Sequence, residues 1–376
     1  MRDFPLYPAI VAVVLAKIYP IFSLYDEIFC LVAVFVALIS LVVKKYHKKR
    51  YLVFASIFSL FVFASFPWLS EVSNLDFVLS LLFLSKFFIF FIYIENLGHR
   101  ECQRLVGFIL IFTIVGLLVQ FFNPNLHAQL IPRSLERGYL QIVLTGFQTN
   151  PNYLAVTICL FLVSYKRWLV TKGAFFLALL STGSRSGLGF AMLMIGAKKS
   201  QHMSMKILLI YMLFAFGLCA IWLYFIGIFD YIVRDIGWLF DGIGSNLYIR
   251  GIVINLSLLM AVDFFPIGGG LGSFATPYSW ASPIYDIYEV SDLHFFYEHS
   301  SAVFDSSLAT LLGSSGVLGT LFFLTSLRVL LKNGSIATRT VSIFFVAIIC
   351  LSIFLPIFSN GYLAIILSII WRIIRE

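Results

Sequence analysis

Long apolar runs recur along almost the whole chain, and they limit the folds that it can adopt. Hydrophobic residues make up 61% of the 376 residues, charged residues only 12%, and the mean hydropathy is +0.98. A soluble domain is about half apolar and a quarter charged, so this chain has too few polar side chains to cover a globule in water. The composition excludes a cytosolic enzyme, a secreted disulfide scaffold and a disordered chain.

A helix that crosses the hydrocarbon core of a bilayer needs about 20 apolar residues, and this criterion gives about twelve candidate transmembrane helices. They cover residues 5–23, 27–43, 51–69, 77–94, 105–122, 151–165, 169–182, 187–198, 207–228, 306–327, 341–358 and 361–373. The sequence therefore predicts an all-α polytopic membrane protein, with residues 1–376 in a single integral membrane domain.

Lysine and arginine lie mostly on one side of these spans. Nineteen of the 26 basic residues fall in segments that the alternation of spans places on the same face, and such a bias marks the cytoplasmic side. Both termini are therefore expected in the cytoplasm. The opposite side then holds a smaller loop over 123–150 and a large loop over 229–305 with short helices. The net charge of +8 follows from this orientation, so no nucleic-acid partner is expected.

Five arginines break the charge pattern, because they lie on the outer face or at its membrane boundary. They are Arg133, Arg137, Arg185, Arg234 and Arg250. Pairing with nearby acids, such as Glu136 beside Arg137, is one explanation. Arg185 has no acid close to it in the sequence Ser-Thr-Gly-Ser-Arg-Ser-Gly over 181–187. An unpaired arginine at membrane depth costs about 3 kcal/mol, and free N–H groups at a helix start bind anions. The segment therefore indicates an anion site.

Candidate general bases cluster before the tenth span. They are His294, Glu298, His299 and Asp305. His299 and Asp305 are the two preferred bases, and the sequence leaves the choice between them open. The alternative is that these residues form a polar network at the surface. No His/Cys grouping has the spacing of a metal site, and neither a metal nor another cofactor is expected.

Several motifs, taken in order, carry a resemblance to a known family. The sixth span opens with Asn-Pro-Asn-Tyr-Leu-Ala over 150–155, and the Arg185 segment follows the seventh span. Pro-Ile-Gly-Gly-Gly-Leu-Gly-Ser-Phe over 266–274 begins sixteen residues after Arg250, and Gly-Val-Leu-Gly over 316–319 follows Asp305. Over roughly residues 100–330, this set resembles the superfamily of bacterial O-antigen polymerases and O-antigen ligases.

The resemblance implies an active site at the periplasmic face of the inner membrane. It implies a metal-independent inverting glycosyltransferase whose donor and acceptor are glycans linked to undecaprenyl pyrophosphate. Arg185 and Arg250 would bind the pyrophosphate, and His299 or Asp305 would act as the base. Further substrate contacts are expected from Arg133, Arg137, Asn152, His294 and Glu298. A polysaccharide chain-length regulator is an implied partner.

The residue at position 305 favours one member of this superfamily. Ligases carry a histidine at the head of this motif, whereas this chain has Asp305 eleven residues before Gly316. The sequence therefore favours a polymerase, with a ligase as the alternative. A secondary transporter is the alternative from another class, because transporters also contain broken helices and buried charges. The lack of an inverted repeat and the long outer loop argue against it.

Overall fold

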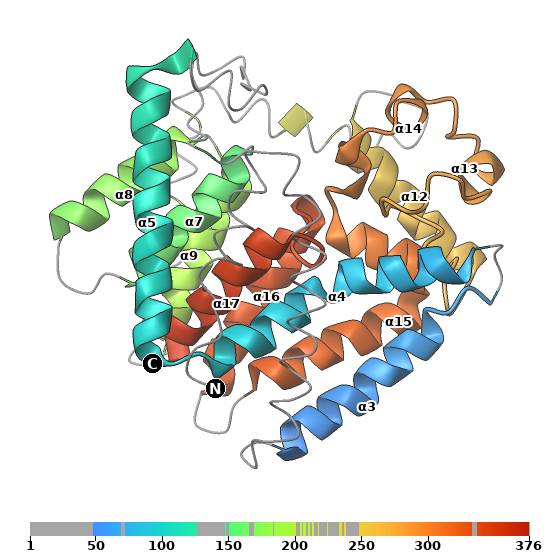
Figure 1. Ribbon diagram of the computed structural model, residues 1–376, viewed down its shortest axis with the longest axis horizontal. Coiled ribbons are helices and arrows are strands. Elements are labelled where there is room, and N and C mark those ends of the chain that lie inside the picture. The colour runs from blue at the N-terminus through green and yellow to red at the C-terminus, as the bar shows by residue number, and fades with distance from the viewer. Residues whose placement is uncertain are drawn as a thin grey trace.

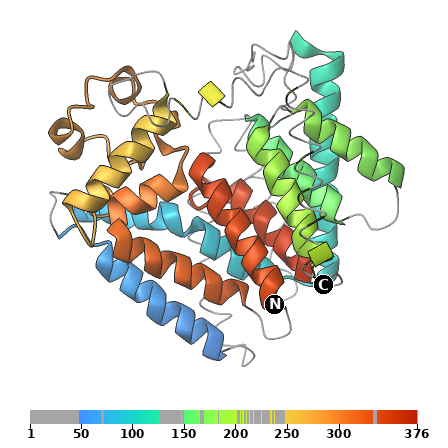
Figure 2. The same ribbon diagram turned by 180° about the vertical axis from the view of Figure 1, so that it is seen from behind.

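The computed structural model describes residues 48–68, 72–125, 147, 150–164, 169–182, 184–200, 248–332 and 337–375, with ten further positions between 204 and 237. All regular secondary structure in these ranges is helical (Figures 1 and 2). The predicted spans 5–23, 27–43 and most of 207–228 lie outside the described residues, as do Arg133 and Arg137. The all-α prediction is confirmed for the described part, and the count of twelve spans stays a prediction.

Nine of the predicted spans coincide with helices. These are α3 (Lys48–Ala64), α4 (Asn74–Asn96), α5 (His99–Phe122), α7 (Pro151–Ser164), α8 (Leu169–Ser181), α9 (Arg185–Lys199), α15 (Ser307–Leu331), α16 (Thr338–Phe354) and α17 (Gly361–Arg375). Three of them, α4, α5 and α15, are long and apolar enough to cross a membrane. The described chain thus has the character of a helical membrane protein.

Two helices are shorter than their predicted spans, and proline explains both differences. α3 ends at Ala64 rather than at 69, and α16 ends at Phe354 rather than at 358. Pro67 and Pro356 follow these ends. Proline has no N–H to continue a helix, and it disfavours helical geometry in the residue before it. A hydropathy criterion does not predict where proline ends a helix.

The predicted large outer loop contains one longer helix besides short ones. The elements are α12 (Ile249–Asp263), α13 (Ile284–Ile287), α14 (His294–Tyr297) and the 3-10 helix η3 (Ser301–Phe304). α12 packs along α15, and it contributes Ile252, Leu256 and Met260 to an apolar core that is separate from the main one. Figure 1 shows these elements grouped at one side of the molecule, above α3 and α15.

The helix α15 is interrupted at Gly316, whose φ of 61° and ψ of −170° are not helical. The glycine-rich segment 266–272 packs against this break and bonds to the backbone on both sides of it. The contacts are Gly269 N–H to Gly313 O at 3.0 Å, Gly270 N–H to Ser314 O at 2.7 Å, and Leu318 N–H to Pro266 O at 3.0 Å. Lipid offers no hydrogen bonds, so irregular backbone within a membrane protein must be satisfied internally. The segment supplies those partners.

Two glycine backbones touch at this break. A Cβ on Gly268 would lie 2.3 Å from the backbone nitrogen of Gly316, and a Cβ on Gly316 would lie 2.3 Å from that of Gly268. Gly268 also has a φ of +69°, which residues with a side chain rarely adopt. Only glycine at both positions allows this approach.

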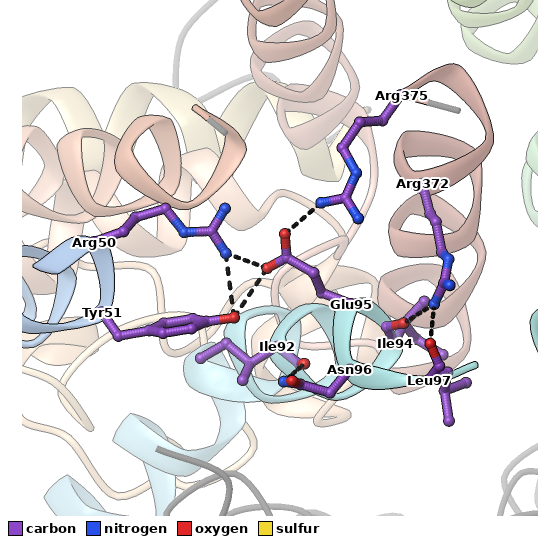
Figure 3. Close-up of polar contacts among 9 residues, drawn as sticks. All are labelled: Arg50, Tyr51, Ile92, Ile94, Glu95, Asn96, Leu97, Arg372 and Arg375. Atoms are coloured by element: carbon purple, nitrogen blue, oxygen red, sulfur yellow. Dashed lines mark hydrogen bonds and ion pairs between the residues drawn. The ribbon is translucent and has the colours of Figure 1, made fainter. Parts of the chain in front are cut away.

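At the other end of the bundle, a buried carboxylate joins three helices. Figure 3 shows Glu95 of α4 between the guanidinium groups of Arg50 and Arg375, which come from α3 and α17. The Tyr51 hydroxyl donates to the same carboxylate at 3.1 Å. Arg372 donates to the carbonyl oxygens of Ile94 and Leu97 at 2.8 and 2.7 Å, which satisfies the end of α4 with a cation.

We predict that Gly268→Ala strongly destabilises the fold. A strained backbone angle costs about 1–3 kcal/mol, and the clash with Gly316 adds about 1–3 kcal/mol of overpacking. Thermal unfolding of the purified protein in detergent measures the effect. Gly107→Ala is the matched control, because a Cβ at Gly107 meets nothing within 4 Å. Equal melting temperatures for the two variants would contradict the packing described here.

We also predict that Glu95→Gln lowers the free energy of unfolding by about 3–5 kcal/mol, because it leaves two largely buried arginines without a counter-charge. The side chains of Arg50 and Arg375 are only 11% and 20% exposed. Glu298→Gln is the control, since Glu298 is 59% exposed and pairs with His294 at the surface. Surface pairs contribute at most about 1 kcal/mol, so the control should unfold like the wild type.

Candidate functional site

Several helices begin close to one another at the end of the bundle opposite Glu95. The starts of α7 and α12 lie at the same, upper side of Figure 1. Hydrogen bonds link the start of α7 to α9 and to the residue before α17, and an ion pair links the start of α12 to the residue that follows η3. Because helix starts carry unpaired N–H groups and partial positive charge, their convergence favours an anion.

Asn152 holds the start of α9 against α7. Its side-chain oxygen accepts from the Ser184 hydroxyl at 2.6 Å and from the Ser186 hydroxyl at 3.5 Å. Ser184 is also the N-cap of α9, where its hydroxyl oxygen accepts from the N–H of Gly187 at 3.0 Å. Both neighbours of Arg185 are therefore anchored. This partly buried arginine occupies the first position of the helix, two residues before the predicted start of the span at 187.

Tyr153 connects the starts of α7 and α9 to the rest of the site. Its hydroxyl oxygen accepts from the side-chain amide of Asn360 at 3.3 Å, and the Asn360 oxygen accepts from the N–H of Leu363 at the start of α17. The phenol also lies within electrostatic range of Asp305 and Arg250. Sequence reasoning assigned no role to Tyr153 or Asn360. Tyr153 is part of the Asn-Pro-Asn-Tyr-Leu-Ala motif, next to Asn152, which could have identified it. For Asn360 the only signal in the sequence is its position just before a predicted span.

Arg250 and Asp305 form an ion pair at the centre of the described site. The guanidinium Nη2 lies 3.1 Å from Oδ2 of Asp305, and the two side chains are 24% and 25% exposed. Burial lowers the pKa of Arg250, but the charge of Asp305 and the hydrogen bond of Tyr248 outweigh it, so the pKa is raised above its usual value. The guanidinium is therefore charged. Its buried Nε has no hydrogen-bond partner among the described residues.

The structure separates the four candidate bases into two groups. Asp305 contacts Arg250, whereas the other three lie on the outer segment around α14. His294 pairs with Glu298 at 3.3 Å, with both side chains exposed. The His299 ring stacks on Trp280 with ring centres 4.6 Å apart, and its φ is 51°. No contact in the described structure joins these three residues to Arg250 or Asp305.

No group of three His, Cys, Asp or Glu side chains that could hold a metal ion occurs within the described residues. The side chains gathered at this site are arginines, a carboxylate, a phenol and amides. Charged arginines next to helix starts suit phosphate, since a guanidinium binds two of its oxygens at once. The carboxylate beside them suits proton transfer.

The comparisons with known proteins add no relative to this picture. No protein-family model matches the chain, and a comparison with curated proteins gives no match either.

We predict that Arg250 and Asp305 are energetically coupled. Arg250→Gln and Asp305→Asn should each lower the free energy of unfolding by about 1–3 kcal/mol, because each leaves a partly buried charge unpaired. The double variant should lose less than the sum, with a coupling of about 1–2 kcal/mol. Chemical unfolding of the four proteins measures this coupling. The same cycle on His294 and Glu298, which are exposed, should give a coupling near zero.

Proposed function

We propose that the chain is a membrane glycosyltransferase that polymerises oligosaccharide repeat units linked to undecaprenyl pyrophosphate. The product is O-antigen or a related surface polysaccharide, made at the periplasmic face of the bacterial inner membrane. One observation carries the proposal. The Arg250–Asp305 ion pair lies at helix starts, together with Tyr153 and within a hydrogen-bonded frame that also contains Arg185.

The positive groups suit the leaving group of this reaction. Transfer of a glycan from its lipid carrier breaks the bond between the anomeric carbon and a pyrophosphate oxygen. Negative charge then develops on the pyrophosphate, which needs fixed positive charge and no general acid. Arg250 supplies such charge from a side chain that is 24% exposed. Arg185 supplies a second cation at the first position of α9.

Asp305 suits the acceptor side. An incoming pyrophosphate competes with the carboxylate for Arg250, and its binding releases Asp305 toward the acceptor. The sugar hydroxyl of the acceptor attacks the anomeric carbon from the face opposite the leaving group, and Asp305 accepts its proton. One C–O bond forms as the other breaks, with inversion at that carbon. In this scheme His299 remains the alternative base.

Helix lengths support a substrate that stays anchored in the bilayer. α7, α9 and α17 have 14, 15 and 15 residues, and at 1.5 Å per residue they are about 21–23 Å long. A hydrocarbon core is about 30 Å thick. If their inner ends lie at the cytoplasmic interface, their outer ends lie below the opposite surface. A lipid-linked pyrophosphate could then reach Arg185 and Arg250 without leaving the membrane.

Two other functions remain as alternatives. An O-antigen ligase would use the same donor and transfer the finished glycan to lipid A-core. A secondary transporter is favoured by one observation, the interruption of α15 at Gly316, because discontinuous helices form the binding sites of many carriers. A chain-length regulator is the protein partner that a polymerase would need.

Deletion of the gene separates these functions through the lipopolysaccharide ladder. A polymerase deletion should leave lipopolysaccharide with a single repeat unit on its core. Loss of every repeat would identify a ligase, and a normal ladder with impaired solute uptake would identify a transporter.

Complementation with variants then tests the site. Arg185→Ala should remove long chains, with a loss of activity of at least about 100-fold, because charge at the leaving group is lost. Arg104→Ala is the control, since Arg104 lies near the start of α5 on the expected cytoplasmic side. Both variants should be present in the membrane at wild-type levels. Wild-type chain lengths with Arg185→Ala would refute its assignment, and comparing Asp305→Asn with His299→Ala identifies the base.

A further inference from the structure

A second polar site lies at the far end of α15 from Asp305. A cavity of about 240 Å³ opens between the end of α15 and the start of α16. Its walls come from two helix faces that the chain brings together across a short connection. The lining residues are Thr325, Arg328, Val329, Lys332, Thr338, Val341 and Ser342.

The spacing of these residues explains how they share one cavity. Thr325, Arg328 and Val329 are three and four positions apart, which places them on one face of α15. Lys332 follows at the end of the same face and is the C-cap residue of α15. Thr338, Val341 and Ser342 repeat that spacing on α16. In the cavity formed by the two faces, the two valines supply apolar surface, and the hydroxyl and cationic side chains lie around them.

The two cations of this cavity have no anionic partner in the described structure. The side chains of Arg328 and Lys332 are exposed, and no acid lines the cavity. Like charges four residues apart on a helix repel each other. Two such charges beside a cavity are stabilised when an anion lies between them.

The place of the cavity in the helix restricts what that anion is. α15 is one of the helices long enough to cross a membrane, so its end lies where the hydrocarbon meets water. There, basic pockets between helices bind the head groups of anionic lipids. The valines of the cavity would contact the part of the lipid's acyl chain nearest its head group. The orientation rule for membrane proteins already explains an excess of lysine and arginine on the expected cytoplasmic side. It does not explain why two of these cations line one cavity.

We propose that this cavity binds the phosphate of an anionic phospholipid head group in the leaflet expected to be cytoplasmic. Arg328 and Lys332 contact the phosphate oxygens, and the hydroxyls of Thr338 and Ser342 donate to them. The site is distinct from the candidate active site. Asp305 precedes the opposite end of α15, on the other side of the break at Gly316. The lipid proposal does not depend on glycosyl transfer.

The test is lipid binding to the full chain, purified in detergent and titrated with dioleoyl phosphatidylglycerol while lipid-bound species are counted by native mass spectrometry. Wild-type protein should retain one phosphatidylglycerol at least tenfold more tightly than dioleoyl phosphatidylcholine. The double variant Arg328→Gln/Lys332→Gln should lose this preference. Both side chains are exposed, so the variant should fold.

Two further variants keep the result specific. Arg100→Gln/Arg104→Gln removes the same charge from an exposed pair of equal spacing near the start of α5, away from the cavity, and it should bind like the wild type. Thr325→Trp fills the cavity without changing its charge, and it should lose the preference as the double variant does.

Three outcomes would overturn the proposal. The first is unchanged phosphatidylglycerol binding in Arg328→Gln/Lys332→Gln. The second is an equal loss in the α5 control, which would mean that the charge of the whole face, rather than this cavity, attracts the lipid. The third is binding of inorganic phosphate as tightly as of the lipid, which would make a soluble phosphate the ligand.

Discussion

The contact between Gly268 and Gly316 is the constraint on which the part of the structure around α12 and the start of α15 depends. A break within α15 frees backbone groups that lipid cannot satisfy, and the segment 266–272 satisfies them. That segment follows α12 directly, so its attachment to α15 also fixes α12. Arg250 stands at the start of α12, and Asp305 stands just before α15. The ion pair at the candidate site is thus positioned by glycine backbones far from either charge.

Arginine plays different roles at the two ends of the bundle. At one end, Arg50 and Arg375 share Glu95, and Arg372 donates to carbonyl oxygens. These three arginines hold α3, α4 and α17 together. At the opposite end, Arg250 shares Asp305. Buried nitrogens without a partner in the described structure occur at both ends, namely Nε and Nη1 of Arg50 and Nε of Arg250. The position of Arg250 at a helix start, rather than its unpaired donor, therefore distinguishes it.

Much of the fold is visible in the sequence, because apolar length is a local property. Nine spans, the short helices of the large predicted loop and a helix start next to Arg185 could all be predicted in this way. Pairings between distant residues could not. Arg250 and Asp305 are 55 residues apart, and Tyr153 and Asn360 are 207 apart. Hydropathy predicts each span but not the helices that pack beside it. The sequence therefore left the choice between His299 and Asp305 open, and the ion pair of Asp305 with Arg250 is seen only in the structure.

The meeting of Gly268 and Gly316 also makes a closed loop of the residues between them. The entropy of closing a loop changes slowly with its length, and both ends of this one are held by the helix frame. Tyr285 and Phe296 of this loop belong to the same buried cluster as Ile252 and Leu256 of α12, so length changes would be tolerated best at the exposed positions between these anchors. Under the proposed function, these exposed positions are where selectivity for different sugars would arise.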